Sequence, residues 1–291
     1  MSLDSIFSRY PDILQSYTAC KLRVYDANPC YLIPKVLKSK TFELEDHGRY
    51  LTIGNAGTTP IVIPVTISTA KEYMQTLLEV IHRYGGAASV PTAYANTLKK
   101  MGYIARKRSW GSIDFVFENK VLLELPGSRF SKRRNALKKL VKNGYTLAPV
   151  TTSDADTALS IEDRWASAYK GGCGGHARKG YASELIRVMD TVAPSIELRG
   201  VKMLDSQGQA VGIALGTRVT SDTWTCGYRF ADNRLDSASL FLLQGLTKLY
   251  PDTVYELDGG GGSPTANLFW TKKQMALRDD LLIEMFTVAL P

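Results

Sequence analysis

The second half of the chain alternates between short apolar runs with period-two spacing and longer stretches in which apolar residues recur every three or four positions. The first pattern predicts strands and the second predicts amphipathic helices. Turn sequences such as DSQG at 205–208 separate the elements, and Pro264 suits the first turn of a helix. We expect strands at 145–150, 196–204, 210–220, 223–230, 253–257 and 281–288, and helices at 153–170, 181–192, 235–250 and 264–275.

The first half of the chain shows a similar order of elements after two early helices. We expect helices at 3–17, 29–38, 70–84 and 92–101, and strands at 41–44, 49–54, 61–67, 87–90, 103–109 and 113–118. After its paired helices, each half follows the order β-β-β-α-β-α-β. The two halves share little residue-level similarity, so the repeat is one of element order.

This repeated order predicts an α/β (α+β) protein with mixed, mostly antiparallel sheets flanked by helices. A length of 291 residues suits two domains. We place an N-terminal domain at 1–127, a basic connecting helix at 128–144 and a C-terminal domain at 145–291. The element order is similar to that of the GCN5-related N-acetyltransferases (GNAT), so this resemblance implies two GNAT-like domains in tandem.

Charge is distributed unevenly along the chain. Residues 1–150 hold 22 Lys and Arg against 11 Asp and Glu, a net charge of +11, whereas residues 151–291 hold 14 against 17, a net charge of −3. A strongly cationic half favours a polyanionic partner, such as nucleic acid, anionic lipid or a phosphate-bearing substrate.

The composition is that of an ordinary globular protein, with 44% hydrophobic and 22% charged residues. We find no apolar run near the ~18 residues of a membrane span and no secretory signal, and we expect a cytoplasmic protein. The four cysteines are far apart and only three histidines are present, so we expect neither a disulfide framework nor a metal site.

Two pairs of sequence stretches resemble one family. The runs SIDFVF at 112–117 and LPGSRFSKRRN at 125–135 are similar to a segment of the C-terminal catalytic domain of lysyl-phosphatidylglycerol synthases and their free-standing relatives. The runs ELDGG at 256–260 and LFWTK at 268–272 are similar to the late motif of that family, and also to the Fem peptidyltransferases. The resemblance implies an aminoacyltransferase that needs no cofactor and takes its amino acid from aminoacyl-tRNA.

The stretch from 129 to 142 contains seven cations and no acidic residue. Apolar residues recur there at helical spacing, so one face can pack while the others stay basic. Like charges at this spacing repel, which favours a partner that supplies the counter-charge over a merely solvated face. We predict that this helix binds the phosphates of the donor, with these residues in contact: Arg129, Lys132, Arg133, Arg134 and Asn135.

The late motif suggests a catalytic centre. Asp258 ends a strand beside four consecutive glycines, where it could accept a proton from an attacking amine or hydroxyl, and Lys272 could neutralise a developing oxyanion. The glycines would let backbone amides approach the ligand, and Trp270 could stack on an adenine. We predict that these residues share one hollow with the basic helix: Asp258, Gly259, Gly260, Trp270, Lys272, Tyr228 and Arg229. A flexible loop and a solvated lysine would explain the same stretch without a function.

Acetyl-CoA-dependent members of the GNAT fold hold pyrophosphate with a glycine-rich loop after the fourth strand. The corresponding stretch, 228–237, contains no glycine, and neither does 65–70 in the first half. Acyl-CoA is therefore the less favoured donor, although an acyl-CoA N-acyltransferase remains an alternative. The acceptor could be a small molecule, a peptide or a lipid that carries an amine or hydroxyl.

Other functions remain open on the sequence alone. The basic helix could serve a non-catalytic nucleic-acid-binding protein, or an enzyme that transfers an amino acid onto nucleic acid itself. Cys173 and His176 could form a catalytic pair, although a flexible glycine loop that happens to contain both explains them better. We find no Ser-His-Asp set, no Walker loop and no Rossmann GxGxxG in its required context.

Overall fold

The structure is a computed structural model that describes residues 8–24, 28–38, 42–55, 57–107, 113–168, 180–232, 234–258, 272–273, 275 and 282–291. It divides into two compact units that are interleaved along the chain. Unit 1 comprises Met1–Phe117, Arg218–Thr225 and Tyr255–Pro291, and unit 2 comprises Glu118–Thr217 and Cys226–Val254. The consecutive domains at 1–127, 128–144 and 145–291 stay a prediction.

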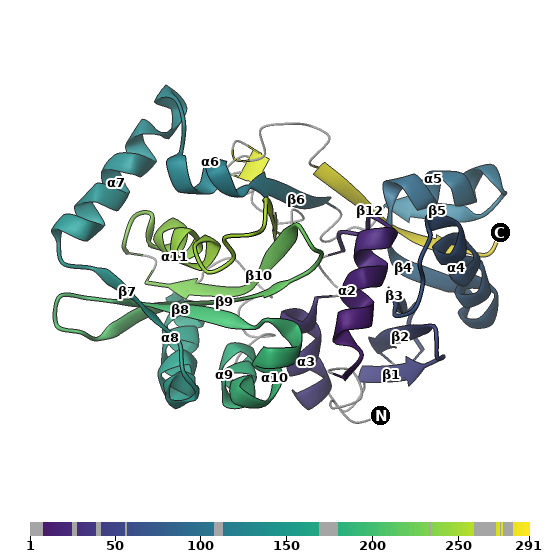
Figure 1. Ribbon diagram of the computed structural model, residues 1–291, viewed down its shortest axis with the longest axis horizontal. Helices are drawn as coiled ribbons and strands as arrows, with labels where there is room; N and C mark the ends of the chain where they lie inside the picture. Colours follow the sequence, from purple (N-terminus) through teal and green to yellow (C-terminus); the bar gives the residue numbers. More distant parts are fainter. Residues whose placement is uncertain are drawn as a thin grey trace. The chain divides into compact units, whose positions relative to one another are not determined.

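The strands of unit 1 form a mixed sheet in the order β1-β2-β3-β4-β12-β6-β11-β10, of which β10 contributes its first residues (Figure 1). Strands β1 to β3 pair antiparallel, and β3 pairs parallel with β4. The strands that begin in unit 1 are β1 (Phe42–Asp46), β2 (Tyr50–Asn55), β3 (Ile61–Pro64), β4 (Gly86–Pro91), β5 (Ile104–Lys107), β6 (Ile113–Glu118), β10 (Thr223–Ala231), β11 (Tyr255–Asp258) and β12 (Leu282–Ala289).

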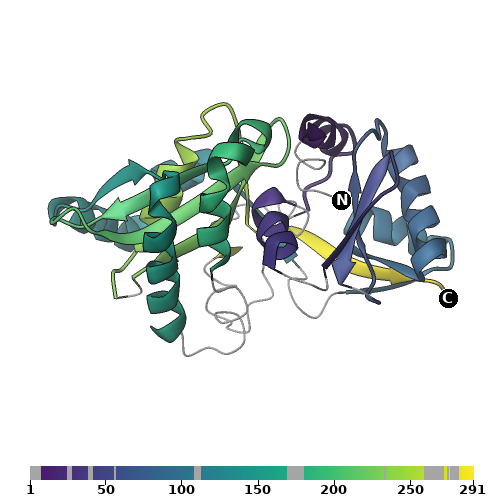
Figure 2. The ribbon, with the colours of Figure 1, turned by 90° about the horizontal axis from the view of Figure 1, so that it is seen from below.

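Four helices cover the sheet of unit 1. Figure 2 shows α4 and α5 on one side of strands β1 to β4, and α2 and α3 on the other. Helix α4 shows why the local sequence folds as predicted: Thr69 accepts a hydrogen bond from the Glu72 amide, and Gly85 ends the helix at φ 77°. The helices are α2 (Tyr10–Ala19), α3 (Pro29–Lys38), α4 (Ala70–Tyr84) and α5 (Thr92–Lys100).

The C-terminal strand β12 joins strands from the first half of the sequence. It pairs antiparallel with β4, β5 and β6. Gly86 in β4 permits this close pairing, because a Cβ atom there would lie 2.7 Å from the backbone oxygen of Val288. The predicted strand at 281–288 is confirmed, whereas its partners did not follow from the sequence pattern.

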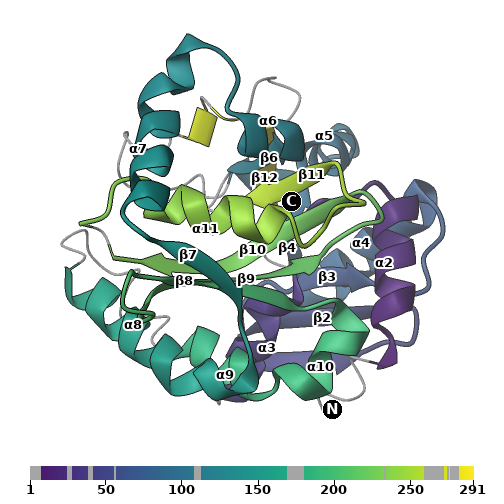
Figure 3. The ribbon, with the colours of Figure 1, turned by 60° about the vertical axis from the view of Figure 1, so that its left-hand side comes forward.

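Unit 2 is built on the strand order β10-β9-β8-β7, with antiparallel pairing of β7 with β8 and β8 with β9. Figure 3 shows α11 along one face of these strands and α8, α9 and α10 toward the other. Gly245 allows α11 to approach closely, because a Cβ atom there would lie 2.5 Å from Leu147 Cδ1. The elements are α6 (Asn119–Glu124), η2 (Ser128–Phe130), α7 (Ser131–Lys142), β7 (Thr146–Pro149), η3 (Thr152–Asp154), α8 (Ala155–Ala168), α9 (Tyr181–Arg187), α10 (Met189–Ile196), β8 (Arg199–Leu204), β9 (Ala210–Arg218) and α11 (Ala238–Thr247).

Several predicted boundaries are wrong. The residues before Glu197 are helical rather than the beginning of a strand, and the left-handed backbone of Glu197 (φ 48°) separates α10 from β8. Helix α11 starts at Ala238 instead of 235, after the left-handed Ser237. The short helix α6 was not predicted; Asn119 at its start donates a 2.9 Å hydrogen bond to the Thr253 carbonyl. Most of the predicted helix at 264–275 lies outside the described residues.

Acid should weaken unit 2 through Asp154. This carboxylate accepts hydrogen bonds from the Thr151 amide and from Lys202 Nζ, at 2.8 and 2.6 Å. Burial alone raises the pKa of Asp154, but Lys202 and Thr151 outweigh burial and hold it below its ordinary value. Its contribution to stability is therefore present above pH ~4, the pKa of an unfolded Asp, and is lost as the pH falls through the lower folded pKa.

We expect Lys202→Met to lower the free energy of unfolding by about 1–2 kcal/mol at pH 7. The difference from the wild type should shrink as the pH falls from 5 toward 2, because Asp154 is then protonated in both proteins. Urea denaturation at each pH measures it, with the exposed Lys248→Met as the control. A difference that stays constant with pH would show that the ion pair is not its source.

Candidate functional site

The predicted catalytic residues Asp258 and Lys272 form a buried ion pair in unit 1. Lys272 Nζ donates to Asp258 Oδ1 at 2.7 Å, and the two side chains are 11% and 12% exposed. The sequence predicted both residues as functional but did not predict that they contact each other. The pair fixes the ammonium at the end of β11, where its attraction to the carboxylate is little screened by water.

The strand that carries Asp258 is held firmly along its length. It pairs parallel with the start of β10, with Tyr255 opposite Thr223 and Leu257 opposite Thr225. The Thr225 hydroxyl donates to the Leu257 carbonyl at 2.6 Å. Such support restricts Asp258 to one position, which a catalytic carboxylate requires.

A second carboxylate, Glu256, lies two residues before Asp258 and is fully buried. Residues i and i+2 of a strand share a face, so both acidic side chains point to the same side of the sheet. Glu256 is the first residue of the ELDGG motif, and the sequence pattern assigned it no role of its own. A charged residue inside a predicted strand was the available signal, because Glu is almost never fully buried unless it has partners.

The predicted phosphate-binding helix is α7 of unit 2, preceded by the short turn η2. Leu137 and Leu140 are buried, as the spacing predicted, and Figure 1 shows α7 at an edge of this unit. Val141, an apolar residue of the same stretch, is 59% exposed. The exposed polar and charged residues of the stretch are Arg129, Ser131, Lys132, Asn135, Lys138, Lys139 and Lys142. Within the described part of the chain, no ion pair joins the seven cations to a carboxylate.

Three arginines of this basic stretch are held against the protein. The guanidinium groups of Arg129 and Arg133 lie 4.8 and 5.7 Å from the ring centroid of the buried Phe130. Burial lowers the pKa of Arg133, opposed by the charge of Asp236. Arg134 Nη1 donates to the backbone carbonyls of Leu125 and Gly127. Arg134 therefore also fastens the turn that precedes α7, a role that the sequence did not predict.

The remaining predicted site residues either belong to unit 2 or fall outside the described residues. Tyr228 is 2% exposed and its ring stacks with Phe230, and Arg229 is half-buried beside it in unit 2. Gly259, Gly260 and Trp270 lie outside the described residues, as do Cys173 and His176. Arg133 belongs to unit 2 and Asp258 to unit 1, and the hollow shared by the two patches stays a prediction.

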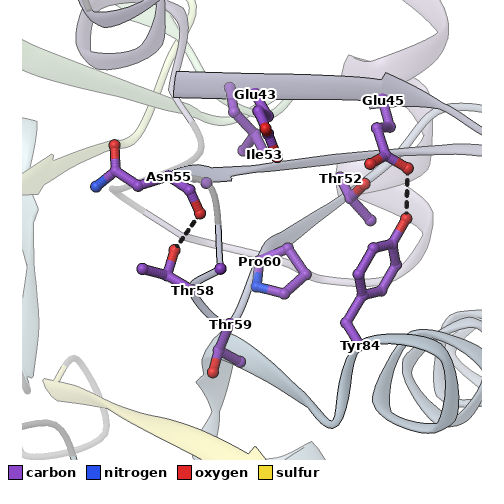
Figure 4. Close-up of a pocket in the computed structure, with 11 residues that line it drawn as sticks. Glu43, Glu45, Thr52, Ile53, Asn55, Thr58, Thr59, Pro60 and Tyr84 are labelled. Carbon is purple, nitrogen blue, oxygen red and sulfur yellow. Dashed lines mark hydrogen bonds between the residues drawn. The ribbon is translucent and has the colours of Figure 1, made fainter. Parts of the chain in front are cut away.

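A polar cavity of about 220 Å³ lies beside β1 and β2 of unit 1 (Figure 4). Glu43 and Glu45 line it from β1, and the Tyr84 hydroxyl donates to Glu45 Oε2 at 2.6 Å. Burial, together with this hydrogen bond, raises the pKa of Tyr84. Strand β1 stands at the end of the strand order, and charges on such a strand discourage pairing with another chain. Protection of the edge strand explains Glu43 and Glu45, so the cavity is not assigned to the candidate site.

The described sheets and the helices that flank them form a GNAT-like fold, which FemX shares. More narrowly, the chain belongs to the family "Phosphatidylglycerol lysyltransferase, C-terminal", whose sequence model matches residues 59–257. The family resemblance drawn from the sequence is confirmed, and so is the predicted α/β fold class of GNAT-like domains. No curated protein matches the sequence.

Solved structures share this fold at low sequence identity. A conserved protein of unknown function from Bacteroides thetaiotaomicron has a TM-score of 0.78 at 15% identity, over 98% of this chain and 97% of its own. FemX has a TM-score of 0.65 at 9% identity, over 97% and 95%. L-PGS from Bacillus licheniformis has a TM-score of 0.58 at 9% identity, over 86% and 84%.

Two further observations concern membranes and metal ions. None of the helices in the described stretches combines the length and the apolar character needed to cross a bilayer. The same stretches contain no group of three or more His, Cys, Asp or Glu side chains placed to hold a metal ion.

Proposed function

We propose that this protein is an aminoacyltransferase that moves an amino acid from aminoacyl-tRNA to an amine or hydroxyl acceptor. The observation that carries the proposal is the exposed cationic face of α7, which lies inside the stretch matched by the family. Asp236 acts on Arg133, but no described carboxylate forms an ion pair with the cations of this face, and a partner rich in phosphate would supply the counter-charge. Transfer of lysine is in keeping with the family name.

The donor's phosphates would contact the exposed lysines of α7 and the guanidinium groups of Arg129 and Arg133. Arginine presents a planar fork of donors that suits phosphate oxygens, and the Phe130 ring holds both forks in place. Asn135 would add a hydrogen bond. Arg134 is assigned mainly to the support of the turn before the helix, since part of its guanidinium already serves two carbonyls.

The chemistry needs only one proton transfer and the stabilisation of one negative charge. The nitrogen or oxygen of the acceptor attacks the ester carbonyl, forming the new amide or ester bond, and the bond from the carbonyl carbon to the terminal ribose oxygen breaks. Asp258 would accept the proton of the nucleophile, which finally resides on the released ribose hydroxyl. Lys272, fixed 2.7 Å from Asp258, would stabilise the oxyanion.

An activated ester carries its own leaving group, so alignment of the two reactants supplies much of the acceleration. Such a transfer therefore does not require a Ser-His-Asp set. The acyl-CoA alternative lacks the glycine loop that would hold pyrophosphate, and we rank it second.

A transfer assay tests the proposal. The full chain is incubated with radiolabelled aminoacyl-tRNAs, one amino acid at a time, and with amine, hydroxyl and phosphatidylglycerol acceptors. We expect the label to leave one tRNA faster than by spontaneous hydrolysis, and to appear on an acceptor. A thermal shift with acetyl-CoA is the parallel measurement, since a ligand at 100 times its Kd adds roughly 2.7 kcal/mol. Stabilisation by acetyl-CoA with no loss of label from any tRNA would contradict the proposal and favour the acyl-CoA alternative.

A further inference from the structure

A cavity of about 380 Å³ in unit 1 lies between the end of α2 and the turn that joins β9 to β10. Its size is within the range of small-molecule sites. None of its residues belongs to the candidate site described above. They are Tyr17, Thr18, Lys21, Arg23, Thr220, Ser221 and Asp222.

Asp222 is the one carboxylate among the residues that line this cavity, and its charge is already balanced. Asp222 Oδ1 accepts 2.7 Å hydrogen bonds from the Thr220 and Thr223 hydroxyls, and Oδ2 accepts one from Arg23 Nη2 at 3.1 Å. Although partial burial raises the pKa of Asp222, these donors outweigh it and hold the pKa below its ordinary value. Asp222 therefore stays ionised and balances Arg23, and no other described residue pairs with the charge of Lys21.

Lys21 occupies a position that usually belongs to glycine. Helix α2 ends with hydrogen bonds from the Leu22 amide to the Tyr17 carbonyl and from the Lys21 amide to the Thr18 carbonyl. This is a Schellman motif, whose left-handed residue is most often glycine. Lys21 adopts φ 52° there despite its side chain. Its exposed ammonium makes no hydrogen bond or ion pair with any described residue.

Tyr17 also lines this cavity, but its hydroxyl has less than 1 Å² of exposed surface. The residue is 2% exposed, and its hydroxyl has no hydrogen-bond partner among the described residues. Burial raises the pKa of this hydroxyl well above its ordinary value, and the nearby Tyr73 and Tyr10 add to the effect. The hydroxyl is therefore protonated, and Tyr17 serves the cavity as part of its wall.

We propose that this cavity binds an oxyanion, a carboxylate or a phosphate, carried by a small molecule. The Lys21 ammonium supplies the charge, and the hydroxyl of the exposed Ser221 supplies a hydrogen bond. Arg23 forms a fixed wall, because Thr223 holds its Nε at 3.2 Å and its guanidinium lies 4.6 Å from the Tyr255 ring centroid. The inference does not rest on the proposed aminoacyl transfer, and it stands if that activity is absent.

Backbone amide signals of the full chain test this site during two titrations, one with sodium phosphate and one with sodium acetate. Chloride is adjusted to keep the ionic strength constant. We expect at least one of the two anions to shift the amide signals of Lys21, Ser221 and Asp222 saturably. A response to phosphate alone identifies a phosphorylated ligand, and a response to acetate identifies a carboxylate.

Two substitutions separate binding from structure. Lys21→Gly removes the ammonium and relieves the left-handed backbone, and Ser221→Ala removes the hydroxyl. We expect Lys21→Gly to weaken anion binding about tenfold or more and Ser221→Ala about fivefold, while neither lowers Tm. The exposed Lys71→Gln should leave anion binding unchanged. The proposal is overturned if neither anion shifts these amides saturably, or if both cavity variants bind as the wild type does.

Discussion

Asp258→Asn is expected to lower the free energy of unfolding by about 3 kcal/mol or more, because it leaves the Lys272 ammonium buried without its carboxylate. Both side chains are close to 10% exposed, so water can replace little of the lost interaction. Lys272→Met should have a similar effect, since it removes the ammonium that donates to the buried carboxylate. The double variant should recover most of the loss, because both charges of the pair are then removed. Urea denaturation of the four proteins measures the coupling.

An exposed ion pair of the same unit is the matched control. Lys107 and Glu284 are 47% and 40% exposed, and pairs of that kind contribute at most about 1 kcal/mol. Lys107→Met should therefore cost less than Asp258→Asn by about 2 kcal/mol or more. Equal losses for the two variants would show that burial gives the Asp258–Lys272 pair no special weight. In the transfer assay, Asp258→Asn should lose activity at temperatures where it is still folded, and Lys107→Met should keep it.

The second large effect is expected on tRNA binding. Replacing Lys132, Lys138, Lys139 and Lys142 by Gln removes four exposed charges from α7 and retains its helix-forming residues. If each lysine neutralises one phosphate, the slope of log K against log salt should become shallower by roughly 3. At physiological salt this corresponds to a loss of about two orders of magnitude in affinity. Filter binding or fluorescence anisotropy over a range of salt concentrations measures both quantities.

A variant of equal net charge is the control for this experiment. Lys71, Lys100, Lys120 and Lys248 are exposed and lie outside α7, and their replacement by Gln removes the same number of charges. Binding that depends on α7 predicts a small change for this control. Similar losses of tRNA affinity in the two quadruple variants would show that α7 acts only through the general electrostatic attraction of a basic protein. Stability should hardly change in the α7 variant, because its lysines make no ion pair with described residues and repel one another.

The local sequence predicted those elements whose signals are contained within a few residues. Helix α4 spans Ala70–Tyr84 as predicted, with Thr69 and Gly85 as its caps, and α7 buries the leucines that the helical spacing selected. Misplaced boundaries lie where a residue with a side chain adopts a left-handed backbone, as at Glu197 and Ser237. A left-handed conformation at such residues has no reliable sequence signature, because glycine is the usual choice there.

The candidate site was predicted by residue type but not by geometry. Asp258 and Lys272 were each singled out, whereas their mutual ion pair joins residues fourteen positions apart. The structural role of Arg134 was also not predicted. Its partners are backbone carbonyls, which every residue has, so the sequence contains no signal for such a contact. The oxyanion cavity was missed altogether: Lys21 and Ser221 are 200 positions apart, and neither belongs to a motif.

By itself, the sequence determined the family, the helices and strands, and the concentration of positive charge on one helix, because periodicity, composition and motifs are properties of neighbouring residues. The tertiary structure decided that β12 inserts among strands of the first half, that Asp258 and Lys272 neutralise each other, and that Lys21 and Tyr17 line one cavity. The physical reason is that pairing, burial and cavity formation depend on which distant segments come together, and the free energy of that assembly is not written in any local pattern.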